Sequence, residues 1–158
     1  MHFGLTVPES GSTPQAKVGF ELKAKTMLYW ATTSLIALET FLGGVVDLTH
    51  GRTAVVSGPL VTQVVTGLGY PVYILAIIGI FKIPGAVTIV VPGLLRLKEW
   101  AYAGIVFELS GAVASHWACG KWGDSIAPLP LLCLAITSWV LRPASRTLGR
   151  CIVPSGRT

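Results

Sequence analysis

The fold is decided by residues 72–91, which read VYILAIIGIFKIPGAVTIVV and carry one charged side chain, that of Lys82. About 20 helical residues at a rise of about 1.5 Å each cover the roughly 30 Å hydrocarbon core of a bilayer. A helix on the surface of a soluble domain differs, because one of its faces is polar and meets water. We therefore expect residues 72–91 to form a membrane-spanning helix.

The composition of the whole chain agrees with a membrane setting. Of its 158 residues, 52% are hydrophobic and 12% are charged, and the mean hydropathy is +0.68. A soluble domain usually has about 25% charged residues. The length suits a single domain. The net charge of +5 does not indicate nucleic-acid binding, because the basic residues lie at the tails and in one short loop.

Three further apolar stretches surround the first one. The four predicted spans are residues 27–46, 72–91, 100–117 and 126–141. They predict an all-α fold, a four-transmembrane-helix bundle at residues 27–142. In the first loop, residues 59–68 have apolar side chains on one helix face, so we expect a short helix there in the membrane interface. Residues 1–26 are expected to be a disordered cytoplasmic N-terminal tail, and residues 143–158 a basic cytoplasmic C-terminal tail.

The distribution of basic residues predicts the orientation of the spans. Nine basic residues fall on one side of a four-span topology, and only Arg52 and Lys121 fall on the other. The nine are Lys17, Lys23, Lys25, Arg96, Lys98, Arg142, Arg146, Arg150 and Arg157. Because lysine and arginine accumulate on the cytoplasmic side of membrane proteins, both termini are predicted to be cytoplasmic. The arginine-rich C-terminal tail is expected to contact anionic lipid.

Charged side chains inside the predicted spans indicate a functional site. Glu39, Lys82 and Glu108 each cost about 2.5–3.5 kcal/mol near the centre of a membrane helix, so we expect them to face the interior and interact there. Lys82 can pair with one carboxylate. The other carboxyl group is expected to be protonated, because burial disfavours its charged form. A neutral buried carboxylic acid can donate a hydrogen bond or a proton to a ligand oxygen.

Further polar candidates lie toward the outer ends of the spans. Asp47, Ser115 and His116 complete the predicted ligand-binding set, although a solvated loop position is the simpler interpretation of Asp47. One helix face of the third span is predicted to approach another helix closely, because most of its side chains are small. This face consists of Gly104, Glu108, Gly111, Ala112 and Ser115. A second interpretation of the charged cluster is an ion-pair lock on helix packing without a ligand.

Four stretches of the chain have the order and spacing of a known family. They are Leu68-Gly-Tyr-Pro71, Lys82-Ile-Pro-Gly-Ala86, Arg96-Leu-Lys-Glu-Trp-Ala-Tyr-Ala-Gly104 and Gly111-Ala-Val-Ala-Ser-His116. Together they resemble the DoxX-like family of small four-span membrane proteins, over most of the chain from Tyr29 to about Arg142. Glu39 with Gly43, Gly44 and Asp47 is similar to a subset of that family. Pro84 departs from the commoner aliphatic residue after the lysine, so the second span is expected to bend differently.

The resemblance implies an association with quinone handling and oxidoreductase systems, or with assembly of other membrane proteins. The chain has no flavin, haem or iron–sulfur motif, so we expect no intrinsic cofactor, and electron transfer would need a membrane redox partner. Cys119, Cys133 and Cys151 form no C-x-x-C pair, and neither a dithiol centre nor a metal site is expected.

Three functional hypotheses follow. The first is a binding site for a lipophilic small molecule, a quinone or an isoprenoid, in a polar-lined cavity that opens toward the outer leaflet. The second is a small isomerase or cyclase in which Glu39 or Glu108 acts as a general acid and Lys82 supplies electrostatic stabilisation. The third is an accessory or assembly protein whose partner is another membrane protein. Membrane lipids and a second copy of the chain are further expected partners.

Overall fold

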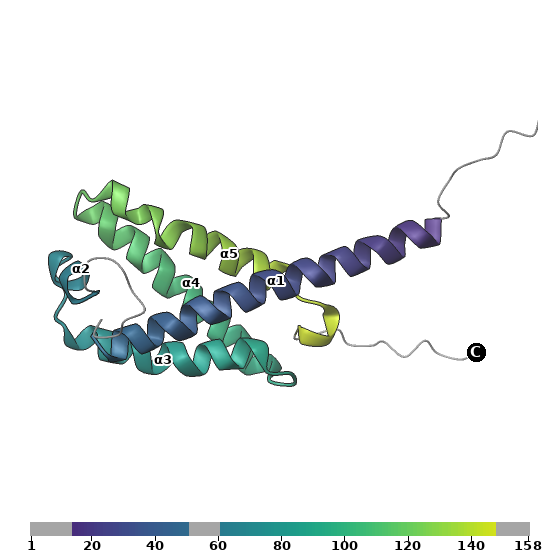
Figure 1. Cartoon of the computed structure of the whole chain (residues 1–158), viewed down its shortest axis with the longest axis horizontal. Coiled ribbons are helices and arrows are strands. Elements are labelled where there is room, and N and C mark those ends of the chain that lie inside the picture. The colour runs from purple at the N-terminus through teal and green to yellow at the C-terminus, as the bar shows by residue number, and fades with distance from the viewer. Residues whose placement is uncertain (1–13, 51–60, 148–158) are drawn as a thin grey trace, which may run out of the picture.

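The computed structural model describes residues 14–50 and 61–147. Five α-helices and two short 3-10 helices form this part of the chain, and it contains no strand (Figure 1). They are α1 (Pro14–Leu48), α2 (Val61–Gly67), α3 (Tyr73–Val90), α4 (Leu95–Ala118), η1 (Trp122–Ile126), α5 (Pro128–Val140) and η2 (Ala144–Arg146). The all-α prediction is confirmed, and α2 is the short helix that was expected in the first loop.

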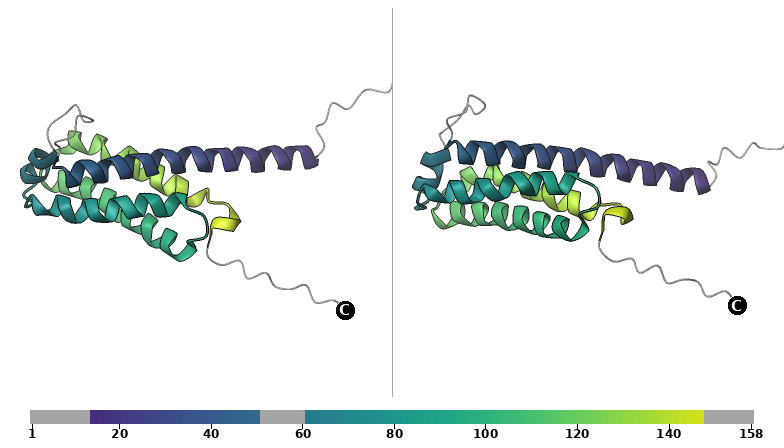
Figure 2. Two further views of the ribbon diagram at one scale, coloured as in Figure 1. Left: turned by 60° about the horizontal axis from the view of Figure 1, so that its bottom comes forward. Right: turned by 90° about the horizontal axis from the view of Figure 1, so that it is seen from below.

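The long helices α1, α3, α4 and α5 form one bundle. Helix α1 contacts α3 and α5, and α4 contacts the same two helices from the other side. We call the end of the bundle with the α3–α4 turn and η2 the tail end, and the end with α2 and η1 the loop end (Figures 1 and 2). The tight α3–α4 turn contains Gly93, whose φ of 87° is a backbone conformation that favours glycine.

The buried core runs through the middle of the bundle and receives side chains from all four long helices. Its buried members are Ile36, Ala37, Ile89, Tyr102, Ile105, Leu109 and Ala135. Many large apolar side chains outside this core are exposed, among them Phe81 at 72% and Phe107 at 74%. An apolar outer surface suits a protein whose surroundings are lipid.

The closest helix contact joins α1 and α3 through glycines. A Cβ atom built on Gly79 would lie 2.8 Å from the carbonyl oxygen of Gly44, and one built on Gly44 would lie 2.9 Å from Lys82 Cβ. Backbones approach this closely only where side chains are absent. The predicted close approach through Gly104 and Gly111 was wrong, since nothing lies within 4 Å of a Cβ atom at either position.

Helix α1 begins at Pro14, well before the predicted start of the first span at residue 27. Residues 14–26, which we expected in a disordered tail, are therefore helical, and residues 1–13 lie outside the described part. The physical reason is local: this segment contains three lysines, two alanines, a glutamine, a leucine and a glutamate, which favour helices, and proline is preferred at a first helical position. This part of α1 projects beyond the other helices at the tail end (Figure 2).

Among the described residues, three helical segments are long and apolar enough to cross a bilayer. They are Lys17–Leu48, Tyr73–Val90 and Trp122–Val140, the last of which combines η1 with α5. Helix α4 has 24 residues but is not among these three segments, and its charged side chains are Arg96, Lys98, Glu99 and Glu108. The chain is therefore an integral membrane protein.

Candidate functional site

A buried ion cluster lies where α1, α3 and α4 meet. Lys82 Nζ on α3 is 2.7 Å from Glu108 Oε1 on α4 and 3.0 Å from Asp47 Oδ2 on α1. The Lys82 side chain is 15% exposed, and the Asp47 and Glu108 side chains are 7% and 25% exposed. One ammonium group thus connects three helices. Lys82 therefore pairs with two carboxylates, those of Glu108 and Asp47.

Asp47 is not the solvated loop residue that the simpler interpretation described. Helix α1 continues to Leu48, so Asp47 lies in its last turn and is only 5% exposed. It follows Gly43 and Gly44 by one helical turn, on the face that approaches α3. The extra helical turn therefore brings its carboxylate to Lys82.

Glu39 borders the same cluster without an ion pair among the described residues. A Cβ atom built on Gly43 would lie 3.3 Å from Lys82 Nζ and 3.5 Å from Glu39 Oε1, so both groups flank this glycine. Three carboxyl groups therefore lie around one ammonium group, one more than the two that the sequence predicted. The protonation of the surplus carboxyl group stays a prediction.

Ser115 and His116 are not brought to the ion cluster. They follow Glu108 by seven and eight residues on α4, about 10–12 Å along the helix axis toward the loop end. Ser115 Oγ is 2.8 Å from the hydroxyl oxygen of Tyr70, in the segment that follows α2. His116 is 8% exposed, and its Nδ1 atom has no hydrogen-bond partner among the described residues. The predicted ligand-binding residues thus divide between the ion cluster and a position nearer the loop end.

A groove of about 420 Å³ between α3 and α4 borders the ion cluster. We call it the α3–α4 groove. Its lining residues are Ile77, Ile78, Phe81, Lys82, Pro84, Gly85, Thr88, Leu97, Trp100, Ala101, Gly104, Ile105 and Glu108. Lys82 and Glu108 supply its charged groups, and its other lining residues are mostly apolar. Gly85 and Gly104 keep it open, because neither has an atom within 4 Å of a Cβ position.

The α3–α4 groove extends in a direction that the sequence did not indicate. From the ion pair it continues along α3 to Thr88 and along α4 to Leu97 and Trp100, which lie at the tail end. The expected cavity opened toward the outer leaflet, which is the loop end in the topology predicted from the sequence. Glu39, Asp47 and His116 do not line the groove, so two of the predicted polar contacts, Lys82 and Glu108, face it.

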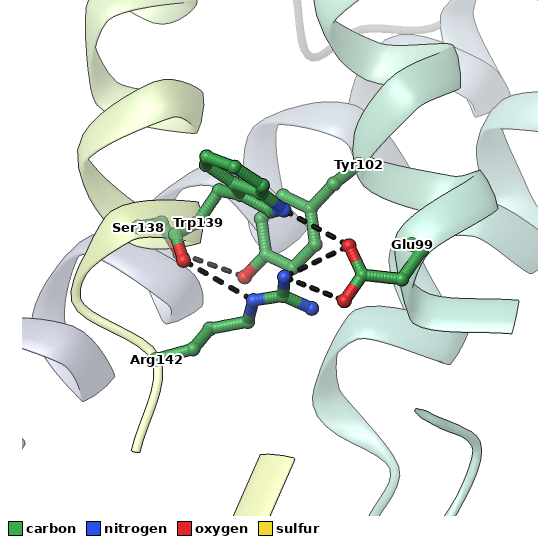
Figure 3. A network of polar contacts seen from close by, with 5 residues as sticks. All are labelled: Glu99, Tyr102, Ser138, Trp139 and Arg142. Atoms are coloured by element: carbon green, nitrogen blue, oxygen red, sulfur yellow. Dashed lines mark hydrogen bonds and ion pairs between the residues drawn. The ribbon is translucent and has the colours of Figure 1, made fainter. Parts of the chain in front are cut away.

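A second polar network lies at the tail end, between α4 and α5. Arg142 Nη2 donates to both carboxylate oxygens of Glu99, at 2.8 and 2.9 Å, and Trp139 Nε1 donates to Glu99 Oε2 at 3.0 Å (Figure 3). Beside them the hydroxyl groups of Tyr102 and Ser138 are 2.8 Å apart. We call this the Glu99–Arg142 network. It ties the first turns of α4 to the C-terminal end of α5.

Lys98 is fully buried and binds the C-terminal end of α3. Its Nζ atom donates to the carbonyl oxygens of Thr88 at 2.6 Å and Ile89 at 2.9 Å, and also to that of Val91. These carbonyl groups have no partners within the helix, and a cation there complements the helix dipole. Sequence reasoning treated Lys98 only as an orientation signal. Lys98, Glu99 and Tyr102 all lie in the stretch from Arg96 to Gly104 that resembles a known family, and this placement could have indicated a structural role for them.

Within residues 14–50 and 61–147, no three His, Cys, Asp or Glu side chains are grouped so that they could hold a metal ion. Cys119 and Cys133 are exposed and are not joined in a disulfide. The site is therefore a groove with one charged pair.

Comparison with known proteins gives one match. The model of the DoxX-like family matches residues 31–138. This range includes Glu39, Asp47, Lys82, Glu99 and Glu108, and it ends just before Trp139. No curated protein and no solved structure matches the chain.

Proposed function

The chain belongs to the DoxX-like family, and from this premise we propose that it is a four-span membrane protein that binds a lipophilic small molecule in the α3–α4 groove. The ligand class that suits the groove best is a quinone or an oxygenated isoprenoid. Helices α1, α3, α4 and α5 are the four spans of this proposal.

The observation that carries the proposal is the groove itself. Its volume of about 420 Å³ falls within the range of roughly 300–1,000 Å³ that is typical of small-molecule sites. Such sites are mostly apolar and have a few polar groups that fix the orientation of the ligand. Here an apolar wall of isoleucine, phenylalanine and tryptophan side chains leads to one charged pair.

The ion pair suits an oxygen atom of the ligand. Lys82 Nζ has three N–H donors, and among the described residues it pairs with two carboxylates, those of Asp47 and Glu108. A ligand carbonyl or hydroxyl oxygen at the end of the groove can accept the third N–H. The two carboxylates outnumber the single ammonium group, so the site disfavours an anion and favours a neutral ligand.

The two alternative functions have less support from the geometry. A general acid must face its substrate, but Glu39 does not line the groove and Glu108 is occupied by Lys82. An assembly role requires a partner protein, and it stays open to test. The assembly alternative is one outcome of the experiment below.

The proposal places the tail end on the cytoplasmic side. Lys23, Lys25, Arg96, Arg142 and Arg146 all belong to segments at or beyond that end of the bundle. The positive-inside rule then assigns the α3–α4 groove to the cytoplasmic leaflet. A ligand would enter it sideways from the hydrocarbon region.

The test is mass spectrometry of small molecules that co-purify with the protein in mild detergent. Glu108→Gln changes the groove wall, and Glu39→Gln makes the same chemical change on α1, outside the groove. We expect a defined lipophilic molecule in the wild type and in Glu39→Gln, and a several-fold loss in Glu108→Gln. The same molecule in equal amounts in all three samples would contradict the proposed site. A co-purified membrane protein without any such molecule would support the assembly alternative.

A further inference from the structure

Three basic side chains gather at the tail end around the C-terminus of α3. Arg146 Nη1 donates to the carbonyl oxygen of Val90 at 3.0 Å, and Lys98 Nζ donates to those of Ile89 and Val91 on either side. The Arg142 guanidinium lies 5.0 Å from the centre of the Tyr102 ring, one helical turn from Lys98 on α4. The three belong to α4, to the segment after α5, and to η2, so the fold brings them together. We call them the tail-end cations.

The acidic groups beside these cations do not balance their charge. Glu99 is the carboxylate paired with Arg142, and the C-terminus of α3 contributes the equivalent of about half a negative charge. Three positive charges face these two contributions, so an excess of more than one positive charge remains. An excess of this kind beside a membrane surface attracts anions.

Within the part of the chain that the structure describes, one strong donor of this group lacks an acceptor. Arg142 is 7% exposed, and its Nη1 atom is buried without a hydrogen-bond partner, whereas its Nη2 and Nε atoms donate to Glu99 and Trp139. Figure 3 shows one guanidinium nitrogen without a contact to the residues drawn. A buried guanidinium donor without a partner costs free energy, and an anionic oxygen would satisfy it.

An apolar groove begins beside Arg142, because three side chains that contact Arg142 also line the groove. It has a volume of about 490 Å³ and lies between α4 and α5. Its lining residues are Glu99, Trp100, Tyr102, Ala103, Val106, Ile136 and Trp139. Glu99, Tyr102 and Trp139 belong also to the Glu99–Arg142 network. A molecule with an anionic head at the tail-end cations could therefore place an apolar chain along α4 and α5.

We propose that the tail-end cations and the α4–α5 groove together bind one anionic phospholipid. Arg142 and Arg146 hold its phosphate group, and an acyl chain occupies the groove. The groove is the reason to choose a lipid over a free phosphate ion, because a soluble anion makes no use of it. Trp30, over which Arg146 stacks at 4.4 Å, and Trp139 flank the phosphate position as interfacial tryptophans do.

The experiment uses the full-length protein in mild detergent, titrated with lipids and followed by native mass spectrometry. The probes are phosphatidylglycerol, phosphatidylcholine and the water-soluble glycerol phosphate. Arg146→Gln removes a tail-end cation, and Arg96→Gln removes the same charge from an exposed position on the first turn of α4. Ala103→Trp fills the α4–α5 groove without changing any charge.

We expect one phosphatidylglycerol molecule to bind more tightly than phosphatidylcholine. Arg146→Gln should weaken its binding about fivefold, the effect of roughly one basic contact at a membrane surface, and Arg96→Gln less than twofold. Ala103→Trp should weaken the binding of phosphatidylglycerol as well. Equal losses in both arginine variants would refute a defined site, and so would equal binding of the two lipids. Binding of glycerol phosphate as tight as that of phosphatidylglycerol would overturn the lipid assignment.

Discussion

Substitution of Gly79 by alanine tests whether the α1–α3 contact holds the ion cluster together. A Cβ atom on Gly79 would lie 2.8 Å from the carbonyl oxygen of Gly44 and 2.8 Å from Leu48 Cγ, where ordinary contacts begin at 3.4 Å. The two helices must therefore separate by about 0.6 Å. Such a shift would stretch the Lys82–Asp47 contact from 3.0 Å to about 3.6 Å, beyond hydrogen-bond distance.

The magnitude follows from two opposing contributions. Added volume in a tightly packed contact costs about 1–3 kcal/mol, and replacement of a helical glycine by alanine contributes about 0.5–1 kcal/mol. The free energy of unfolding of Gly79→Ala should therefore fall by up to about 2.5 kcal/mol. At about 2–4 °C per kcal/mol for a chain of this size, the Tm should fall by several degrees.

Gly85→Ala is the matched control on the same helix. Nothing lies within 4 Å of a Cβ atom at Gly85, so only the helix contribution remains, and the Tm should stay unchanged or rise slightly. Thermal unfolding in mild detergent, followed by the fluorescence of the five tryptophans, measures both variants. A Gly79→Ala protein as stable as Gly85→Ala would refute the close α1–α3 contact.

Three further predictions concern charge and topology. Lys82→Met should lower the free energy of unfolding by about 3–5 kcal/mol, because it leaves two buried carboxylates without their cation, and a chemical-denaturation midpoint close to that of the wild type would contradict this. A double-mutant cycle with Glu99→Gln and Arg142→Gln should give a coupling energy of about 2 kcal/mol, and additive losses would show that the two-bond contact contributes nothing. A variant in which Cys119 is the only cysteine should react in intact cells with a membrane-impermeant maleimide, because Cys119 is exposed at the loop end. Protection of Cys119 until the cells are lysed would reverse the proposed orientation.

The architecture of the chain was largely predictable because long apolar runs dictate membrane helices. The boundaries of α3 and α4 fall within a few residues of the predicted spans, and the periodic apolar face at residues 59–68 became α2. The start of α1 was predicted too late, because the helix was expected to begin where the apolar run begins. Residues 14–26 are helical through local propensity, which continues past the apolar run.

The site was harder to predict because contacts between helices depend on how the helices rotate and approach. The cost of buried charge predicted that Lys82 and Glu108 would find partners inside the bundle, and the two side chains do form an ion pair. Asp47 was misjudged because its burial depends on one additional helical turn and on the close approach at Gly44 and Gly79. The small residues of α4 gave a misleading signal, since Gly104 opens a groove and does not contact a helix.

The most direct test of the account is occupancy of the α3–α4 groove when it is filled by a side chain. Gly104→Leu places a side chain in the groove, whereas Gly111→Leu adds the same group to the same helix at a position that is also open but outside the groove lining. Lipophilic molecules that co-purify with each variant are identified by mass spectrometry. The account predicts that the ligand is retained by Gly111→Leu and lost from Gly104→Leu. Retention by Gly104→Leu at the wild-type level would contradict it.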